Sequence, residues 1–575
     1  MRKNRVRRAA ALMLGILVIL LMGCSRQPSI SWASMGNSSL KPQATGEEAS
    51  KIRVSVVGTG GEMDPSRNAQ QGALGLFSVV YEGLVKLDDA RRPALNLAES
   101  YKVEEGTGRF VFTLRPNIRF HNGDTMTAYD VKESLDKHKA NSSAYGWVLD
   151  AIEGWEVLSE RQIALMPAQG QGGYGFLYSM VFPVFRPAAG DICAGTGPYG
   201  IVEYTPGESI TLRVSPSYWR APPKIVTIEG KFHLNDDEAL GALYLNEVDI
   251  AYTRLTTLIG KGVDDLYQTQ FVAQQCEVLL FNMGEGQLFS HATLRKAVSM
   301  AINRKAIVSG VYQNHGASVQ VPVVPDSFLG VAQLDLNEYE TRDILTLLGG
   351  IGYADVDGDG FLERQGDTPQ VQNTAGLPPP SPSAPLSAPP ETTPEATPPS
   401  VEGMVPKTPT PTHADVENAL KITLVTSDST ERREAAQAIA TALGAIGFEV
   451  SVEPLAMQAL NTRLEAGTFD ICLAGYEMGT NPDLSFILSS QGEGNVMGYQ
   501  SAQMDALLQS VHSAQTQIDY ANAQTVVYEE YLKDLPFVTL FFRSGTMVYS
   551  LNIQYLTTVR DNEPLRGIEK WQIVP

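Results

Sequence analysis

The sequence predicts an α/β protein of two or three domains. Its 575 residues exceed what one hydrophobic core usually supports. A hydrophobic content of 43% and a charged content of 19% are typical of a folded protein. A strand pattern at 421–427, a helical pattern at 431–447 and a second strand pattern at 448–455 follow one another. A helical crossover between two strands implies a parallel pair, which is the unit of an α/β sheet.

The N-terminus has the three parts of a signal peptide. A basic run (Arg2, Lys3, Arg5, Arg7, Arg8) precedes fourteen apolar residues at 9–22, which are too few for a bilayer span and suited to a signal core. The segment "LMGC", ending at Cys24, resembles a bacterial lipobox, in which the cysteine is lipidated and becomes the first mature residue. We therefore predict a signal peptide at 1–23 and a lipid anchor on Cys24. A short anchor helix with an incidental cysteine is the alternative.

Residues 24–50, rich in Ser, Gly, Gln and Pro, read as a flexible stalk between the lipid and the folded body. The protein would then sit outside the cytoplasmic membrane, on the cell surface of a Gram-positive or the periplasmic face of a Gram-negative bacterium. The formal charge of -20 becomes about -25 without the five basic signal residues (-20 minus 5). This charge argues against nucleic acid as a partner.

We expect Cys193, Cys276 and Cys472 to be buried free thiols, although two of them could pair.

Further elements follow in chain order. Alternation predicts strands at 51–58 and 109–114, and Asn122-Gly123 predicts a turn. Residues 127–140 read as a helix with Thr127 as N-cap, and residues 291–312 have apolar residues at helical spacing.

Between Pro378 and Pro411 lie 13 of the 34 prolines. Such a segment buries little apolar surface, so we predict a disordered insertion at 367–417. A linker between independent domains is the competing interpretation.

Residues 92–131 carry a family resemblance. The matching elements are Pro93, Leu97 to Ser100, Phe112 to Arg115, Phe120-His121-Asn122-Gly123 and Ala128-Tyr129-Asp130-Val131. They resemble the signature of the peptide/nickel class (family 5) of bacterial extracellular solute-binding proteins, the lipoprotein receptors of ABC importers. The resemblance extends over nearly the whole mature chain, through segments such as "GTGPY" (Gly195, Gly197, Pro198 and Tyr199 among them) and "NVMGYQSAQMDALL" at 495–508.

The resemblance implies a two-lobed, periplasmic-binding-protein-like fold (class II). Lobe I would comprise 51–84, 195–272 and 545–575, with an extra subdomain at 85–194 that carries the signature. Lobe II would comprise 273–544, which makes the proline tract an insertion within a lobe and not a linker. The signature residues Phe120, His121, Gly123 and Asp130, together with the GTGPY residues, would then be structural.

Two apparent motifs are set aside. "GTGPYG" at 195–200 satisfies the dinucleotide fingerprint, but Pro198 has no N–H for a phosphate, and residues 201–214 read as a hairpin and not a helix. His121 has no second histidine or cysteine nearby at metal-ligand spacing, so a hydrogen-bonded structural role is favoured.

For ligand contact, the resemblance points to 474–488. Peptide-binding members commonly place an aspartate a few residues before an Asn/Asp-Pro step, where it pairs with the ligand's α-amino group. Here the matching position is Met478, so Glu477 would serve through a one-residue shift; a solvated surface glutamate is the alternative. The aromatic residues Tyr476, Tyr145, Trp147 and Tyr174 are candidates to line the cleft, although such residues are more often part of a core.

The predicted function is a non-catalytic receptor that binds an oligopeptide between its lobes and delivers it to an ABC permease. It would act as a monomer and need no cofactor. Rival ligands in the class are nickel chelates, haem, sugars and signalling peptides. A surface hydrolase is a second class, for which the sequence contains no nucleophile motif such as G-x-S-x-G.

A third class is a calcium-dependent surface protein, suggested by "DVDGDGFLE" at 355–363. Asp355, Asp357 and Asp359 have the spacing of an EF-hand loop, but the twelfth position, which should be a bidentate Glu, is Gly366. Asp and Gly also suit turns that need no ion. Calcium there is the weaker interpretation.

Overall fold

A computed structural model describes residues 50–141, 144–187, 192–254, 266–329, 339–364, 420–479, 481–556 and 559–574. The predicted signal peptide, nearly all of the predicted stalk and the proline tract lie outside these ranges. Cys193, Cys276 and Cys472 are buried and unpaired, as predicted. No helix within the described ranges is long and apolar enough to span a bilayer.

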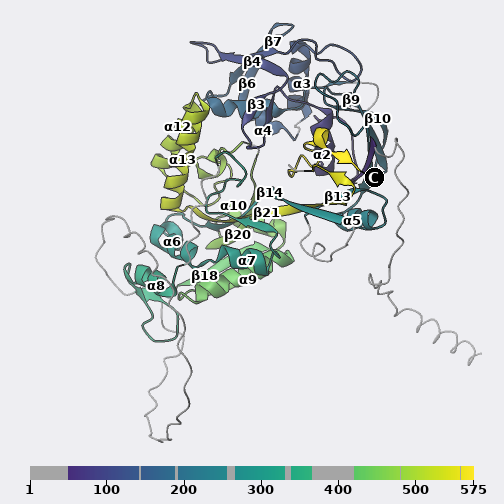
Figure 1. Ribbon diagram of the computed structural model, residues 1–575. Helices are drawn as coiled ribbons and strands as arrows, with labels where there is room; N and C mark the ends of the chain where they lie inside the picture. The colour runs from purple at the N-terminus through teal and green to yellow at the C-terminus, as the bar shows by residue number, and fades with distance from the viewer. Residues whose placement is uncertain are drawn as a thin grey trace, which may run out of the picture. The chain divides into compact units, whose positions relative to one another are not determined.

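A mixed eleven-stranded sheet is the main feature of the described chain (Figure 1). Its order is β10 (Tyr199–Thr205), β11 (Ser209–Val214), β12 (Thr227–His233), β1 (Lys51–Val57), β13 (Ile250–Thr253), β21 (Phe537–Ser550), β14 (Leu266–Phe281), β20 (Ile471–Glu477), β18 (Lys421–Ser427) and β19 (Glu449–Leu455), with β15 (Gly316–Ser318) beside β21. β1 runs parallel to β12 and β13, and β18 runs parallel to β19 and β20. The predicted β-α-β unit at 421–455 is therefore confirmed.

Helices cover both faces of each parallel region. The alternation in β1 directs Ile52, Val54 and Val56 toward α2 (Gln71–Val80) and Val57 toward α5 (Asp236–Tyr244). In β18, Leu424 packs with α9 (Thr430–Gly444) and Val425 with α10 (Met457–Glu465). The sheet is thus buried between layers, as parallel strands require.

The helical pattern at 291–312 is two helices and not one. α6 (Ala292–Ala301) ends at Ile302, whose backbone is extended, and α7 (Arg304–Gly310) begins after Asn303. The side chain of Asn303 accepts a hydrogen bond from the N–H of Ala306 at 2.9 Å. This asparagine N-cap explains the break, because apolar spacing alone does not reveal where one helix stops and another starts.

A smaller, four-stranded sheet lies within the predicted subdomain. Its order is β4 (Ala98–Val103), β5 (Phe110–Leu114), β7 (Gln162–Pro167) and β6 (Ile152–Ser159), with α3 (Ala128–Asn141), α4 (Gly146–Asp150) and the 3-10 helix η3 (Tyr174–Val181) packed beside it. η3 contacts α12 (Ala502–Ser513) and α13 (Gln517–Asp534). The N–H of Tyr174 donates to the carbonyl of Ala514 at 2.6 Å, and its ring lies 5.6 Å from that of Tyr520.

The remaining elements are short. They are the strand pairs β2 (Val85–Leu87) and β3 (Pro93–Leu95), β8 (Arg186–Pro187) and β9 (Cys193–Ala194), β16 (Tyr353–Ala354) and β17 (Glu363–Arg364), β22 (Ile553–Gln554) and β23 (Gln572–Ile573), and the helices η4 (Leu288–Ser290), α8 (Thr341–Gly349), α11 (Ser485–Leu488) and η5 (Ile568–Lys570). The description stops at Arg364 and resumes at Leu420. The N–H of Leu420 donates to the carbonyl of Leu362 at 2.9 Å, so these two chain ends are adjacent.

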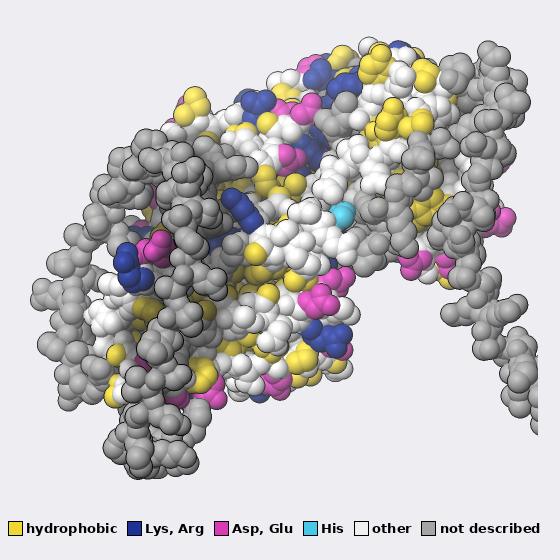
Figure 2. Space-filling model, turned by 60° about the horizontal axis from the view of Figure 1, so that its bottom comes forward, with side chains coloured by type: hydrophobic (Ala, Val, Ile, Leu, Met, Phe, Trp, Pro, Cys, Tyr) yellow, Lys and Arg dark blue, Asp and Glu magenta, His cyan; other side chains and the backbone are white. Residues whose placement is uncertain are grey.

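Charged side chains of both signs are interspersed on the face shown in Figure 2. Elsewhere in the described chain, exposed charges form close pairs, such as Lys421 with Glu449 at 3.0 Å and Lys132 with Asp136 at 2.6 Å. On this face the basic side chains do not gather into the continuous stripe that a nucleic-acid backbone would need.

Candidate functional site

Two long antiparallel strands, β14 and β21, contribute residues to three large hydrophobic cores of the described chain. Phe271 and Met547 belong to the core that contains β1, whereas Leu279 and Val538 belong to the core that contains α9. The pairing register shifts between Val272 and Cys276. This irregularity lies where the sequence places the boundary between the lobes, at 272/273 and 544/545; the lobe boundaries themselves stay predictions.

Polar groups from distant segments converge at the register shift. The N–H of Gln274 donates to Asp561 Oδ2 at 3.2 Å, and Asn562 donates to Gln274 Oε1 at 3.0 Å. Arg254, directly after β13, places Nη2 at 2.5 Å from Asp561 Oδ2, and the hydroxyl of Tyr252 donates to the same carboxylate. Burial opposes the charge of Arg254, but Tyr252 and Asp561 outweigh it and raise the pKa of the guanidinium.

Glu477 ends β20 beside this group. It lies opposite Gln275 in β14, and the next residue, Met478, donates its N–H to the carbonyl of Gln274 at 2.9 Å. Its side chain is exposed, and no ion pair of Glu477 is formed within the described residues. Partial desolvation raises the pKa of its carboxyl, Arg254 opposes this rise and Asp561 adds to it. Glu477 is thus an accessible carboxylate close to a cation that is already paired.

The backbone beside Glu477 offers an open strand edge. The N–H of Asn282 donates to the carbonyl of Asp470, and the N–H of Met478 donates to the carbonyl of Gln274. These two bonds show that the even-numbered residues of β20 direct their backbone polar groups toward β14 and the odd-numbered ones away from it. Gly475 and Glu477 therefore direct their N–H and C=O groups away from β14. β18 pairs along that edge with Ile471 to Leu473 only. On the edge that faces away from β14, no described strand lies along Gly475 to Glu477, so an extended chain could add there.

The aromatic candidates differ in placement. Tyr476 is half-buried, donates its hydroxyl to Gly494 O at 3.0 Å and packs edge-on against Phe486, and burial raises its pKa to about 12. Tyr174 packs against Tyr520, and Tyr145 packs edge-on against His138. Trp147 belongs to α4, and its side chain lies outside what the structure describes. Among the three tyrosines of this set, Tyr476 is the direct neighbour of Glu477 in β20.

The signature residues make structural contacts. His121 Nε2 lies 3.0 Å from the carbonyl of Gly197, and burial lowers the pKa of its ring. A Cβ on Gly195 would lie 2.0 Å from the carbonyl of Val80, so only glycine fits there. Phe120 is fully buried with the guanidinium of Arg186 over its ring, and Arg186 also pairs with Asp130. Gly123 has a φ of +89° in the predicted turn, and the hydroxyl of buried Tyr199 donates to Ile225 O at 2.8 Å.

A Ser-His-Asp group near α12 does not have the geometry of a hydrolytic triad. Ser485 Oγ and Asp483 Oδ2 both approach the same ring nitrogen, His512 Nε2, at 3.1 and 2.8 Å. A catalytic histidine uses one nitrogen for the nucleophile and the other for the acid. Burial opposes protonation of His512, but Asp483 outweighs it and raises the pKa of the ring, as expected of an ion pair.

The 355–363 turn is held by hydrogen bonds from its backbone N–H groups to its own aspartate side chains. Gly358 and Gly360 donate their N–H groups to the two oxygens of Asp355 at 2.7 and 3.2 Å, and both glycines have positive φ. The carboxylates that converge are Asp355, Asp357 and Glu363, whereas the sequence had pointed to Asp359 as the third. Asp359 instead accepts the N–H of Phe361 at 2.8 Å.

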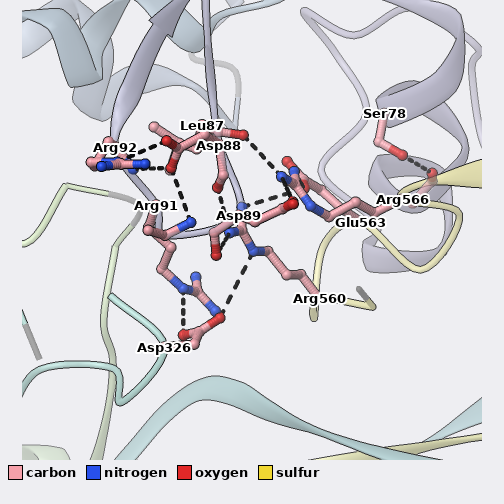
Figure 3. Close-up of polar contacts among 12 residues, drawn as sticks. Ser78, Leu87, Asp88, Asp89, Arg91, Arg92, Asp326, Arg560, Glu563 and Arg566 are labelled. Atoms are coloured by element: carbon pink, nitrogen blue, oxygen red, sulfur yellow. Dashed lines mark hydrogen bonds and ion pairs between the residues drawn. The ribbon is translucent and has the colours of Figure 1, made fainter. Parts of the chain in front are cut away.

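A second polar cluster, absent from the sequence-based expectations, joins three distant segments (Figure 3). Asp326 lies 2.7 Å from Arg91 Nε and 3.9 Å from Arg560 Nε. The N–H of Phe328 donates to the carbonyl of Ala90 at 2.8 Å, and Arg560 donates to the carbonyl of Asp88 at 2.7 Å. Burial lowers the pKa of Arg560 to about 10. By the predicted boundaries this cluster links the subdomain, lobe II and lobe I.

Sequence reasoning also missed Arg254, Gln274 and Asp561. Arg254 and Glu477 each lie at the end of a strand, and polar residues at strand ends are one signal that could have indicated them. Asp561 gives no such signal, because its partner Arg254 is 307 positions away.

The chain is similar to known proteins over most of its length. Residues 92–498 match the family model described as bacterial extracellular solute-binding proteins, family 5 Middle. The oligopeptide-binding protein AppA of Bacillus subtilis is 23% identical, over 98% of this chain and 99% of that protein. Its structure with a nonapeptide matches with a TM-score of 0.60 at 19% identity, covering 93% of this chain and 100% of that one. The structure of a nickel ABC transporter from Bacillus halodurans matches with a TM-score of 0.72 at 16% identity, covering 91% of this chain and 100% of that one.

Proposed function

The chain belongs to the bacterial extracellular solute-binding proteins of family 5, the solute-binding components of ABC importers, and we propose that its solute is an oligopeptide. Its fold is the two-lobed α/β fold of that class. The observation that carries the proposal is the open edge of β20 at Gly475 to Glu477, which ends in an accessible carboxylate. An extended peptide can pair its backbone with this edge irrespective of its sequence.

Glu477 would bind the α-amino group of the peptide. A carboxylate facing an ammonium is a charge-assisted contact. Ionised Glu477 is disfavoured by partial desolvation in the unliganded protein, as its raised pKa indicates. An incoming ammonium would relieve that cost by supplying the opposite charge. Met478, which occupies the position of the usual aspartate, is 4% exposed and cannot take this role.

Binding would favour a closed form that the permease recognises. The contacts of Asp326 with Arg91 and of Phe328 with Ala90 join segments of the predicted subdomain and lobe II. Opening of the cleft would have to break them, whereas β14 and β21 would stay continuous and bend at the register shift. The ligand then shifts the equilibrium by its preference for the closed arrangement.

The peptide proposal is tested by titration calorimetry on the purified protein with a mixed panel of di- to nonapeptides and with nickel–histidine as a separate arm. We expect peptides to bind and to raise the melting temperature. Failure of every peptide at millimolar concentration, or binding of nickel–histidine alone, would overturn it.

The amine contact is tested with one bound peptide in free and N-acetylated form. Glu477→Gln should weaken binding of the free form by about 10- to 100-fold, as loss of a hydrogen bond to a charged group implies, and leave the acetylated form unchanged. Glu285→Gln is the matched control, since Glu285 is also exposed and follows the C-terminal end of β14, away from Glu477 in the ladder. Equal loss for both peptides would contradict an amine contact.

We also propose that Cys24 is lipidated after removal of residues 1–23, and that the mature protein is a lipid-anchored monomer. The support is the lipobox-like "LMGC" sequence. Expression of Cys24→Ala in a bacterium should release the protein from the membrane fraction into the soluble one. Retention of the variant with the membrane would contradict the anchor.

A further inference from the structure

A cavity of about 250 Å³ lies between α2, the ends of β1 and β13, and the segment at 564–565. Its apolar wall is made of side chains that are at most 5% exposed: Val54, Val56, Leu76, Ile250, Met547 and Leu565. An apolar cavity of about 150 Å³ can hold a benzene ring. The space is therefore large enough for an aromatic or long aliphatic side chain.

Two glycines in α2 allow this helix to approach its neighbours closely at the wall of the cavity. Gly72 and Gly75 both line the cavity. A Cβ on Gly72 would lie 2.3 Å from the carbonyl of Val57, and a Cβ on Gly75 would lie 2.8 Å from Pro564 Cγ. The helix thus approaches the strand and the C-terminal segment at points where it presents no side chain. The two glycines therefore fix how closely α2 lies against this wall of the cavity.

The polar residues of the cavity connect it with the strand edge. Asp236, Arg254 and Asp561 also line it. Asp561 accepts the N–H of Gln274, whose carbonyl accepts the N–H of Met478, so the cavity and Glu477 are separated by a short chain of hydrogen bonds.

The charge at this place is unbalanced. Asp236, Asp561 and Glu477 bring three carboxylates, and Arg254 brings one guanidinium, for a formal charge of -2 (one minus three). Asp236 is engaged with Thr253 Oγ1 and with the N–H of Arg254, at 2.7 and 2.9 Å. A surplus of negative charge beside an apolar wall favours a ligand that carries a positive charge next to an apolar group.

We propose that this cavity is a subsite for a large apolar side chain on the first residue of the bound peptide. The first residue of a peptide carries both an ammonium and a side chain on one Cα, which matches a carboxylate-rich mouth beside an apolar pocket. The inference rests on the proposed function, because it takes the amino terminus to lie at Glu477. It adds a specificity that backbone pairing at a strand edge does not supply.

The test measures the binding of three pentapeptides to the unmodified protein by titration calorimetry. The peptides are Phe-Ala-Ala-Ala-Ala, its isomer Ala-Ala-Ala-Ala-Phe, and pentaalanine. The two isomers have the same composition and charge. We expect the first to bind at least tenfold more tightly than the other two, since burying a phenylalanine side chain is worth at least that factor. Affinities of the isomers within threefold would overturn the subsite.

A pair of variants locates the effect. Leu76→Trp fills the cavity and should abolish the preference for the first isomer while pentaalanine binds as before. Leu74→Trp is the control, since Leu74 lies in the same helix and does not line the cavity. A preference that survives Leu76→Trp in a folded variant would overturn the assignment; if that variant does not fold, the isomers on the unmodified protein decide.

The outcomes separate the two proposals. Binding of all three peptides with equal affinity overturns the subsite and leaves the peptide function standing. Absence of binding for all three, together with failure of the wider panel, overturns the peptide function and the subsite with it.

Discussion

Glu277 and Glu477 lie on neighbouring strands, two positions apart in one ladder, and have opposite surroundings. Glu277 in β14 is opposite Gly475, and Glu477 in β20 is opposite Gln275. Glu277 is fully buried and is held by Arg432, at 3.0 Å to Oε2, and by Arg543, at 2.7 Å to Oε1. Glu477 is exposed and faces a cation that is paired with Asp561. A carboxylate with two arginines has no capacity left for a ligand, whereas Glu477 has.

Gly475 is part of the reason for this difference. A Cβ at Gly475 would lie 2.2 Å from Arg432 Nη2, so the absent side chain makes room for the guanidinium that neutralises Glu277. The same residue provides one of the unpaired backbone positions of the open edge. One glycine therefore supports a structural ion cluster on the face of the sheet and an available hydrogen-bonding edge beside it.

The largest effect should come from breaking the buried cluster. Glu277→Ala leaves the buried guanidinium of Arg432 and the half-buried one of Arg543 without their carboxylate, and we expect the free energy of unfolding to fall by about 3–5 kcal/mol. Glu477→Ala should change it by less than about 0.5 kcal/mol, as an exposed substitution. Urea unfolding followed by circular dichroism measures both. Similar losses for the two variants would remove the contrast between the glutamates.

A smaller effect should appear in the pH dependence of peptide binding. The pKa of Glu477 is raised by desolvation, so the carboxyl takes up its proton at a higher pH than an ordinary glutamate. The ionised form destabilises the unliganded protein, and this cost disappears as the pH falls through that pKa. Binding of an ammonium needs the ionised form, so affinity for a free-amine peptide should fall as the pH is lowered from 7 to 5.

The control for this measurement is Glu477→Gln, in which the part of the pH dependence due to this carboxyl should be absent. An N-acetylated peptide should likewise bind the unmodified protein with little change over the same range. If the variant and the unmodified protein lose affinity for the free-amine peptide in parallel, another group is responsible.

The smallest effect is expected at Asp326, the carboxylate shared by Arg91 and Arg560. It resembles Glu277 in having two arginines, but its side chain is 43% exposed. Water screens such pairs, so Asp326→Ala should lower the free energy of unfolding by no more than about 1 kcal/mol. Repeating the urea unfolding in 0.5 M NaCl should reduce the difference further. A loss as large as that of Glu277→Ala would show that exposure does not separate the two clusters.

The sequence was informative wherever the cause of a structure is local. The alternation in β1, the β-α-β unit at 421–455 and the glycine turns at 355–363 depend on neighbouring residues, and they could be predicted. Asn303 is also local, but an N-cap in the middle of an apolar pattern is easily missed. The carboxylate Glu477 was found through a family resemblance and not through any periodicity.

The rest of the site depends on contacts between distant residues. Arg254 meets Asp561 across 307 positions, and Arg91 meets Asp326 across 235. No local pattern encodes such pairs. The tyrosines at 145 and 174 illustrate the converse problem, since their residue type suits a cleft and a core equally well, and the structure packs them against His138 and Tyr520.

The adjacency of Leu362 and Leu420 has a practical consequence. The described chain stops at Arg364 and resumes at Leu420, and one backbone hydrogen bond joins Leu362 to Leu420. Both leucines are buried and Arg364 is exposed. Because Leu362 and Leu420 are held next to each other, we expect a change in the length of the chain between them to leave β18 and α9 unaltered, since closing a longer loop between fixed ends adds little free energy. This junction is accordingly a natural attachment point for a reporter domain, far in sequence from the strand edge at Glu477.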